Sequence, residues 1–239
     1  MDGELTRMPL VLMYHAVQPY DADPHRVIVR PERFARQIRW LRRRGRRGVS
    51  MRELLAARRA GRDAGLVGLT FDDGYANFVT EVLPVLAEHG CTATVYVVAG
   101  ALGGHNTWDQ PGPRMDLMTR ADVRHAAAAG CEIGSHSLTH VPLTEVDADD
   151  LAEQVALSRD VLAGVAGQAV TGFCYPYGAA GPREAQAVRA AGYDYAVATK
   201  PPAVTDRYAI PRTFIGDRDA APRLYAKVAR HRLTARRAA

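Results

Sequence analysis

Seven short apolar runs alternate with helix-like segments along this chain of 239 residues, and this alternation limits the possible folds most. The runs predict strands at residues 10–14, 66–71, 92–98, 131–135, 170–174, 193–198 and 209–214, the last broken by Pro211. Strands that alternate with helices indicate a parallel sheet, because each crossover needs a helix to return the chain. Seven such strands can close into a barrel, although an open doubly wound sheet would have nearly the same pattern.

The helices are predicted from amphipathic spacing, capping residues and glycine stops. Phe34, Ile38 and Leu41 share one face of the first helix, which Pro31 begins. The expected helices cover residues 31–45, 50–55, 77–89, 119–130, 147–163 and 182–191, with a last basic helix from residue 220. Residues 99–118 form a long loop, a type that often serves as a lid or binding edge.

Two adjacent carboxylates, Asp72 and Asp73, end the strand at residues 66–71 and precede Gly74. Neighbouring carboxylates repel each other unless they share a cation or a proton. A metal ion would let one of them act as a ligand and leave the other free as a base. The alternative is an ordinary strand that ends in an Asp-Gly turn.

Two histidines, His136 and His140, follow the strand at residues 131–135. Their spacing of four places both imidazoles on one face of a helical turn, from which both could reach one ion. Together with Asp73 they form a set of two imidazoles and one carboxylate, which is typical of a catalytic metal with open positions. Such a set suits a divalent cation, zinc first, and cobalt, nickel or iron would also fit.

The two stretches TFDDG and SHSLTH resemble the motifs of the polysaccharide deacetylase family, the NodB-homology enzymes of carbohydrate esterase family 4. The resemblance covers residues 10–215 and implies a distorted (β/α)7 barrel. It also implies metal-dependent removal of an N-acyl group, usually acetyl, from an amino sugar. By the same resemblance Asp72 is the general base and Asp73 the metal ligand. The stretch Pro176-Tyr177-Gly178 matches a third motif, in which the backbone N–H of Tyr177 is the expected oxyanion donor.

Two positions depart from the family pattern. Cys174 stands where an arginine normally holds the base, and Arg212 in the last strand is our candidate to replace it, with an ordinary surface arginine as the alternative. The late Leu-x-x-His motif that supplies the general acid is absent. His15, after the first strand, resembles the early histidine of the branch that acts on poly-N-acetylglucosamine, and it is our candidate acid. A structural histidine is the alternative.

Aromatic residues supply candidate sugar contacts, namely Trp108 in the long loop and Tyr175. Packing within the loop is the alternative for Trp108. The residues suspected on chemical grounds lie at or near the carboxyl ends of strands, which favours a barrel, because those ends converge on one face.

The length suits one barrel-sized domain or two small ones. The family resemblance implies one catalytic domain, which we place at residues 1–218, followed by a basic tail at residues 219–239. The three cysteines are widely spaced, which indicates buried free thiols in a reducing compartment. The N-terminus lacks a basic region, and the apolar run at residues 9–14 is too short for a signal peptide or a transmembrane helix. We therefore expect a cytoplasmic protein and an N-acetylated sugar or glycan substrate made or held inside the cell.

The net charge is +5, and arginines cluster at residues 42–47 and in the tail. Such runs could meet anionic lipid, a polyphosphate-linked glycan or nucleic acid, but we favour a solvated surface. Nucleic acid is not an expected partner, whereas a lipid- or carrier-linked substrate and peripheral membrane contact through the tail stay open. Two other functions also stay open: a deformylase or non-sugar amidase with the same site, and a glycan-binding module that has lost catalysis.

Overall fold

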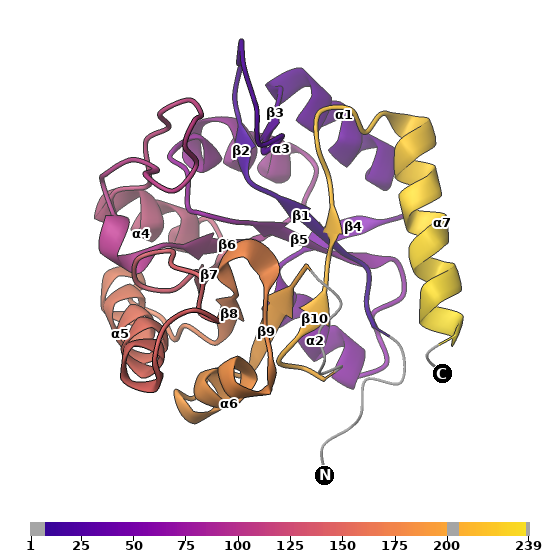
Figure 1. Cartoon of the computed structure of the whole chain (residues 1–239). Helices are drawn as coiled ribbons and strands as arrows, with labels where there is room; N and C mark the ends of the chain where they lie inside the picture. The colour runs from indigo at the N-terminus through magenta and orange to yellow at the C-terminus, as the bar shows by residue number, and fades with distance from the viewer. Residues whose placement is uncertain (1–7, 200–205, 238–239) are drawn as a thin grey trace.

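Parallel pairing joins the predicted strands into one nearly closed sheet, shown in the computed structural model of Figure 1. The structure describes residues 8–199 and 206–237, so the predictions for the first residues and for the end of the tail lie outside it. The main strands are β1 (Val11–Tyr14), β5 (Leu66–Phe71), β6 (Thr94–Val97), β7 (Glu132–Ser135), β8 (Gly172–Cys174), β9 (Tyr195–Ala198), β10 (Ile210–Pro211) and β11 (Thr213–Phe214). Their order is β10-β9-β8-β7-β6-β5-β1-β11, and every pair is parallel.

The last segment closes the sheet, because β10 pairs with β9 while β11 pairs with β1. Only Arg212 separates β10 from β11. The backbone N–H of Arg212 donates to the Ala198 carbonyl at 3.1 Å, and that of Ile215 donates to the Met13 carbonyl at 2.8 Å. The predicted distorted (β/α)7 barrel is confirmed, with β10 and β11 as the two halves of its seventh strand.

Helices surround the sheet on its outer side (Figure 1). They are α1 (Pro31–Arg42), α2 (Met51–Arg59), α3 (Leu83–Glu88), α4 (Arg120–Ala128), α5 (Ala148–Ala166), α6 (Pro182–Ala190) and α7 (Ala221–Arg237). Phe34, Ile38 and Leu41 of α1 are buried, as their spacing predicts. None of the helices in the described ranges combines the length and the apolar character that crossing a membrane requires.

The basic tail helix is present as α7, and its Leu224 and Val228 are buried in the main core. The division of the chain after residue 218 stays a prediction. The cysteines Cys91, Cys131 and Cys174 are buried free thiols, as expected.

The sequence pattern missed three short strands and one change of helix type. Strand β4 (Arg47–Val49) pairs with β5, and β2 (Ala16–Val17) pairs with β3 (Ile28–Val29) in a separate small sheet. Strands of two or three residues are too short to show a periodicity. The helix predicted at residues 77–89 begins as a π-helical segment, Phe78–Val82, before α3. Pro84 explains this wider turn, because proline has no N–H to donate and its ring would clash with the carbonyl four residues earlier.

The barrel interior holds a fully buried carboxyl group, that of Glu132 in β7. Its Oε1 accepts a hydrogen bond from the Tyr195 hydroxyl at 2.9 Å. Its Oε2 accepts from the Thr94 hydroxyl at 2.8 Å and from the Arg52 backbone N–H at 2.7 Å. Burial nevertheless raises the pKa of Glu132 above its usual value, because these donors offset only part of the lost hydration.

We expect the unfolding free energy of the wild type to exceed that of a Glu132→Gln variant by less as pH rises. Because the folded-state pKa is raised, the stability due to Glu132 is fully present below the unfolded-state pKa and is lost as pH passes through the folded-state pKa. Urea denaturation of both proteins with a chelator, between about pH 4 and pH 8, gives the difference in unfolding free energy. A difference in unfolding free energy that stays constant or grows with pH would contradict the raised pKa of Glu132.

Candidate active site

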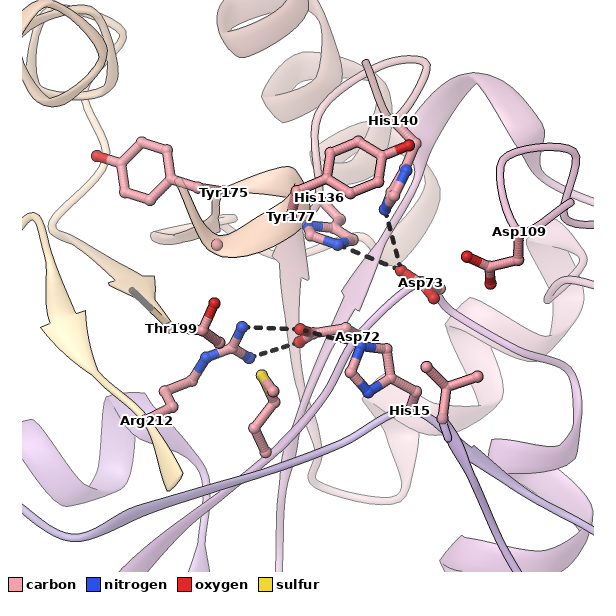
Figure 2. Close-up of a pocket in the computed structure, with 13 residues that line it drawn as sticks. His15, Asp72, Asp73, Asp109, His136, His140, Tyr175, Tyr177, Thr199 and Arg212 are labelled. Atoms are coloured by element: carbon pink, nitrogen blue, oxygen red, sulfur yellow. Dashed lines mark hydrogen bonds and ion pairs between the residues drawn. The ribbon is translucent and has the colours of Figure 1, made fainter. Parts of the chain in front are cut away.

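A pocket of about 210 Å³ lies where the carboxyl ends of the barrel strands converge (Figure 2). Eight of the nine predicted site residues line it, and Trp108 is the exception. The eight are His15, Asp72, Asp73, His136, His140, Tyr175, Tyr177 and Arg212. The topology thus brings residues from five separate strand ends to one place.

Asp73, His136 and His140 present one ligand atom each toward a common point (Figure 2). Asp73 Oδ1 lies 3.2 Å from His136 Nε2 and 3.3 Å from His140 Nε2, and all three residues are buried. Ligands on a tetrahedral zinc ion with bonds of about 2.0–2.1 Å would stand about 3.4 Å apart. The spacing and the chemistry of these donors therefore fit a divalent cation.

The tautomer of His136 strengthens this fit. Its Nδ1 lies 2.8 Å from the Cys174 backbone carbonyl, which can only accept, so Nδ1 carries a proton. In a neutral ring, Nε2 then presents a lone pair toward the Asp73 carboxylate. A lone pair that faces a carboxylate oxygen is unfavourable unless a cation lies between them or the imidazole is protonated.

The two histidines do not share a helical turn, so that part of the prediction is wrong. Residues 136–140 form a loop without helix, in which Ser137 (φ 65°) and His140 (φ 62°) are left-handed. The Ser137 hydroxyl accepts from the His140 backbone N–H at 3.0 Å. Gln154 Oε1, from α5, accepts from the backbone N–H groups of Leu138 and Thr139 at 3.1 and 3.0 Å. These side-chain caps replace the helical hydrogen bonds.

Aromatic rings hold His140 in place. The Trp108 ring stacks on the His140 ring with centroids 4.3 Å apart, and the Tyr177 ring meets it edge-on at 4.9 Å. His140 Nδ1 has no hydrogen-bond partner among the described residues, so these contacts orient the ring instead. The face of Trp108 that lies on His140 is not free to stack on a sugar.

Tyr175 is among the residues that line the pocket, but its ring is directed away from it. Tyr175 is fully buried, and its hydroxyl donates to the Tyr208 carbonyl at 2.8 Å. Figure 2 shows this ring directed away from the pocket residues, so the structure gives it no face for a sugar. From the sequence alone, an inward and an outward ring after β8 could not be distinguished.

Asp72 forms a buried bidentate ion pair with Arg212 (Figure 2). Arg212 Nη1 and Nη2 donate to Oδ1 and Oδ2 of Asp72 at 2.5 and 2.7 Å. Burial alone would raise the pKa of Asp72, but the Arg212 guanidinium outweighs it and the net pKa lies below the usual value. The structure thus places Arg212 in contact with Asp72, whereas the alternative was a surface arginine.

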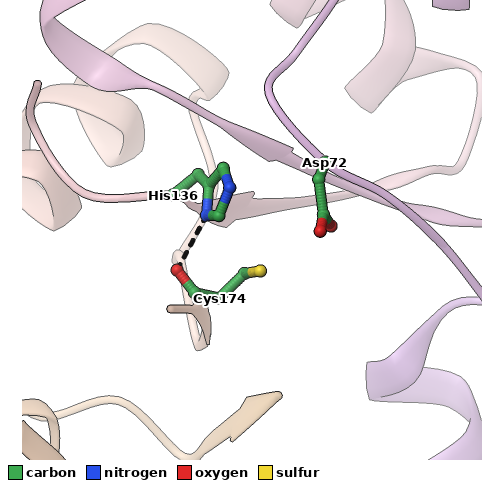
Figure 3. Close-up of side chains that lie close together, drawn as sticks. All are labelled: Asp72, His136 and Cys174. Carbon is green, nitrogen blue, oxygen red and sulfur yellow. Dashed lines mark hydrogen bonds between the residues drawn. The ribbon is translucent and has the colours of Figure 1, made fainter. Parts of the chain in front are cut away.

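The short side chain of Cys174 leaves room for this arginine. Its Sγ accepts a hydrogen bond from Arg212 Nη2 at 3.1 Å. Cys174, Asp72 and His136 also form a second cluster of potential ligands (Figure 3). We assign no metal to it, because the guanidinium already neutralises Asp72 and burial raises the pKa of the Cys174 thiol. In Figure 3 the contact of His136 runs to the carbonyl of Cys174, away from the thiol.

His15 lines the pocket on the other side of Asp72 from Arg212 (Figure 2). Its Nε2 is 3.9 Å from Asp72 Oδ2, and 16% of its side chain is exposed. Its Nδ1 is buried without a hydrogen-bond partner in the described part of the chain. The ring therefore combines solvent access with nearness to the carboxylate.

Backbone strain concentrates around the pocket. Of the five non-glycine residues with positive φ in the described chain, four belong to the site: Asp73, Ser137, His140 and Tyr177. Such conformations cost of order 1–3 kcal/mol each and persist only where the surroundings enforce them. Gly178 (φ 66°) is required beside Tyr177, because a Cβ there would lie 1.5 Å from the Thr199 hydroxyl.

Sequence reasoning missed two polar side chains of the pocket, those of Asp109 and Thr199. Asp109 lies in the long loop next to Trp108, and its carboxylate accepts from the Tyr75 hydroxyl at 2.9 Å. An acidic residue in a long loop was the available signal for it. Thr199 follows β9 and had no distinguishing pattern.

A family model described as "Polysaccharide deacetylase" matches residues 59–196. Among curated proteins, the chitooligosaccharide deacetylase of Rhizobium leguminosarum bv. trifolii is 35% identical over 121 residues, which cover 50% of this chain and 50% of that protein. The chain matches at most 66% of the length of the first curated relatives.

Solved structures share the fold. The Streptococcus pyogenes deacetylase PplD, in complex with acetate, aligns with a TM-score of 0.78 at 21% identity over 92% of this chain and 97% of that one. IcaB from Ammonifex degensii aligns with a TM-score of 0.76 at 24% identity over 95% and 97%.

Replacing Arg212 should destabilise the protein strongly. Arg212→Gln leaves the Asp72 carboxylate buried without its counter-charge, which costs about 3–5 kcal/mol of unfolding free energy. The matched control is Arg189→Gln, which breaks the largely exposed pair with Asp206 and should cost less than about 1 kcal/mol. Urea denaturation at pH 7 measures both values. Equal small losses would mean that the buried pair is not important for stability.

Proposed function

The chain belongs to the polysaccharide deacetylase family, and we propose that it is a metal-dependent hydrolase that removes the acetyl group from an N-acetylated amino sugar of a glycan. One observation carries the proposal. His136 Nε2 and His140 Nε2 face Asp73 Oδ1 at 3.2 and 3.3 Å, beside a carboxylate that Arg212 holds. This arrangement pairs a cation site with a separate base.

Asp73, His136 and His140 would hold the cation, with zinc favoured and cobalt, nickel or iron compatible with the same ligands. When bound, a divalent cation supplies Lewis acidity that makes water a better nucleophile and polarises the acyl oxygen. The buried Nδ1–H contact of His136 with the Cys174 carbonyl keeps its Nε2 available as a ligand.

Asp72 would accept the proton of the attacking water. Its low pKa makes it a weak base, but the bidentate contact with Arg212 fixes both oxygens, and position contributes much of the effect of a general base. The water oxygen bonds to the acyl carbon, and the acyl oxygen gains negative charge. The left-handed Tyr177 turn would direct its backbone N–H toward that oxygen.

His15 would complete the reaction as the general acid. The C–N bond breaks, and the departing nitrogen takes the proton from His15, which gives acetate and a free amino sugar. The position of His15, 3.9 Å from Asp72 and partly exposed, supports this role.

The catalytically silent alternative rested on the missing arginine and the missing late histidine. Arg212 and His15 both line the pocket, which supports an enzyme instead. Acetate and formate release distinguish an acetyl from a formyl substrate, and a non-sugar amide stays an alternative. A carrier-linked substrate, membrane contact through the tail and a cytoplasmic location stay predictions.

Metal-stripped protein should release acetate from N-acetylglucosamine oligomers only after zinc or cobalt is added. Asp72→Asn should lower turnover by at least about 10²-fold, because it removes the base while it keeps the shape of the side chain. The matched control is Asp63→Asn, whose carboxylate pairs with Arg58 away from the pocket and should leave turnover unchanged. Acetate and formate are quantified separately by enzymatic assay.

Release that does not depend on metal, or that survives in Asp72→Asn, would contradict the proposed mechanism. Formate release from N-formyl substrates, without acetate release, would favour a deformylase. Bound metal without turnover on any of these amides would favour the binding module.

His15→Ala should slow hydrolysis of the N-acetyl amide by about 10²–10⁴-fold. The same change should cost far less with 4-nitrophenyl acetate, because a phenolate leaves without a proton. Comparing the loss of kcat on the two substrates tests whether His15 is the general acid. Equal losses on both would show that His15 only maintains the structure of the pocket.

A further inference from the structure

A second groove, of about 430 Å³, lies between α1 and the start of α7, outside the catalytic pocket. These two helices are neighbours in Figure 1, although they lie near opposite ends of the chain. The groove is lined by five arginines from α1 and the residues just after it: Arg33, Arg36, Arg39, Arg43 and Arg44.

None of these arginines forms an ion pair with any residue that the structure describes. Arg44 is held over the Trp40 ring, with its guanidinium carbon 4.2 Å from the ring centroid. The acid in the groove is Asp219, and Lys227 already neutralises it at 2.6 Å. Positive side chains three and four residues apart on a helix repel each other, so the groove is most stable with an anion nearby.

Buried donors without partners also line the groove. Trp40 is only 7% exposed, and its Nε1 is buried without a hydrogen-bond partner in the described ranges. The same holds for Nε of Arg33. A buried N–H without a partner is unfavourable, so a phosphate oxygen that reached either group after the neighbouring side chains moved apart would be a favourable acceptor.

The amino end of α7 adds a third attractive feature. Ala220 accepts the first helical hydrogen bond, from the Leu224 N–H, but it has no side-chain oxygen to cap the other N–H groups. The helix has 17 residues, and the partial positive charge at its first turn favours an anion. Ala220, Ala221 and Pro222 all line the groove.

We propose that the groove between α1 and α7 binds a phosphate or pyrophosphate group, carried by a soluble phosphate ester or by a lipid headgroup. Planar guanidinium groups bind phosphate oxygens in pairs, and two or more of them around a helix terminus match that chemistry. The inference does not depend on the proposed deacetylation, because binding is measured without turnover.

Titration calorimetry of the full chain with inorganic pyrophosphate at low salt tests the proposal. We expect one site, weakened at least tenfold in Arg36→Gln/Arg43→Gln. Both residues are exposed, so their loss leaves the core intact, which circular dichroism checks. The matched control is Arg59→Gln/Arg124→Gln, which removes the same charge from exposed positions on α2 and α4 and should bind within about twofold of wild type.

Three outcomes would overturn the proposal: no binding, equal loss in both double variants, or unchanged affinity in Arg36→Gln/Arg43→Gln. The last would mean that pyrophosphate binds elsewhere, for example through a metal at the catalytic site. Binding to phosphatidylglycerol vesicles distinguishes a lipid phosphate from a soluble phosphate ester. Vesicle binding that pyrophosphate competes away supports a lipid phosphate as the natural ligand, whereas pyrophosphate binding without vesicle binding supports a soluble ester.

Discussion

The buried ion pair between Asp72 and Arg212 is the interaction on which the site depends. Asp72 and Asp73 are adjacent, both almost fully buried, and each needs its own positive partner. Arg212 neutralises Asp72, whereas Asp73 shares the proposed cation site with His136 and His140. Since Arg212 is the residue between β10 and β11, the segment that closes the barrel also supplies the counter-charge of the proposed base.

Most of the fold was predictable because its signal is local. Apolar runs of four to six residues mark the longer strands, and Phe34, Ile38 and Leu41 mark the inner face of α1. The parts that were missed depend on contacts that a local pattern does not contain. Strand β4 exists because it pairs with β5, and the π-helical segment before α3 reflects the local conflict at Pro84.

The candidate site was predictable by residue type and much less by geometry. Asp73, His136 and His140 converge, but left-handed residues at 137 and 140 produce that convergence where a helical turn was expected. Aromatic residues are ambiguous for a related reason. Trp108 stacks on His140 and Tyr175 packs into the core, and no spacing rule distinguishes these positions from open sugar contacts.

Cys174 and Arg212 show why one position can take over the task of another in this fold. They are 38 residues apart in sequence, and Arg212 is 140 residues from Asp72, yet all three meet at one end of the barrel. An inward side chain at the end of almost any strand can reach the same centre. A thiol at position 174 is small enough to leave that space to Arg212, so the departure from the expected motif and the late arginine are two halves of one arrangement.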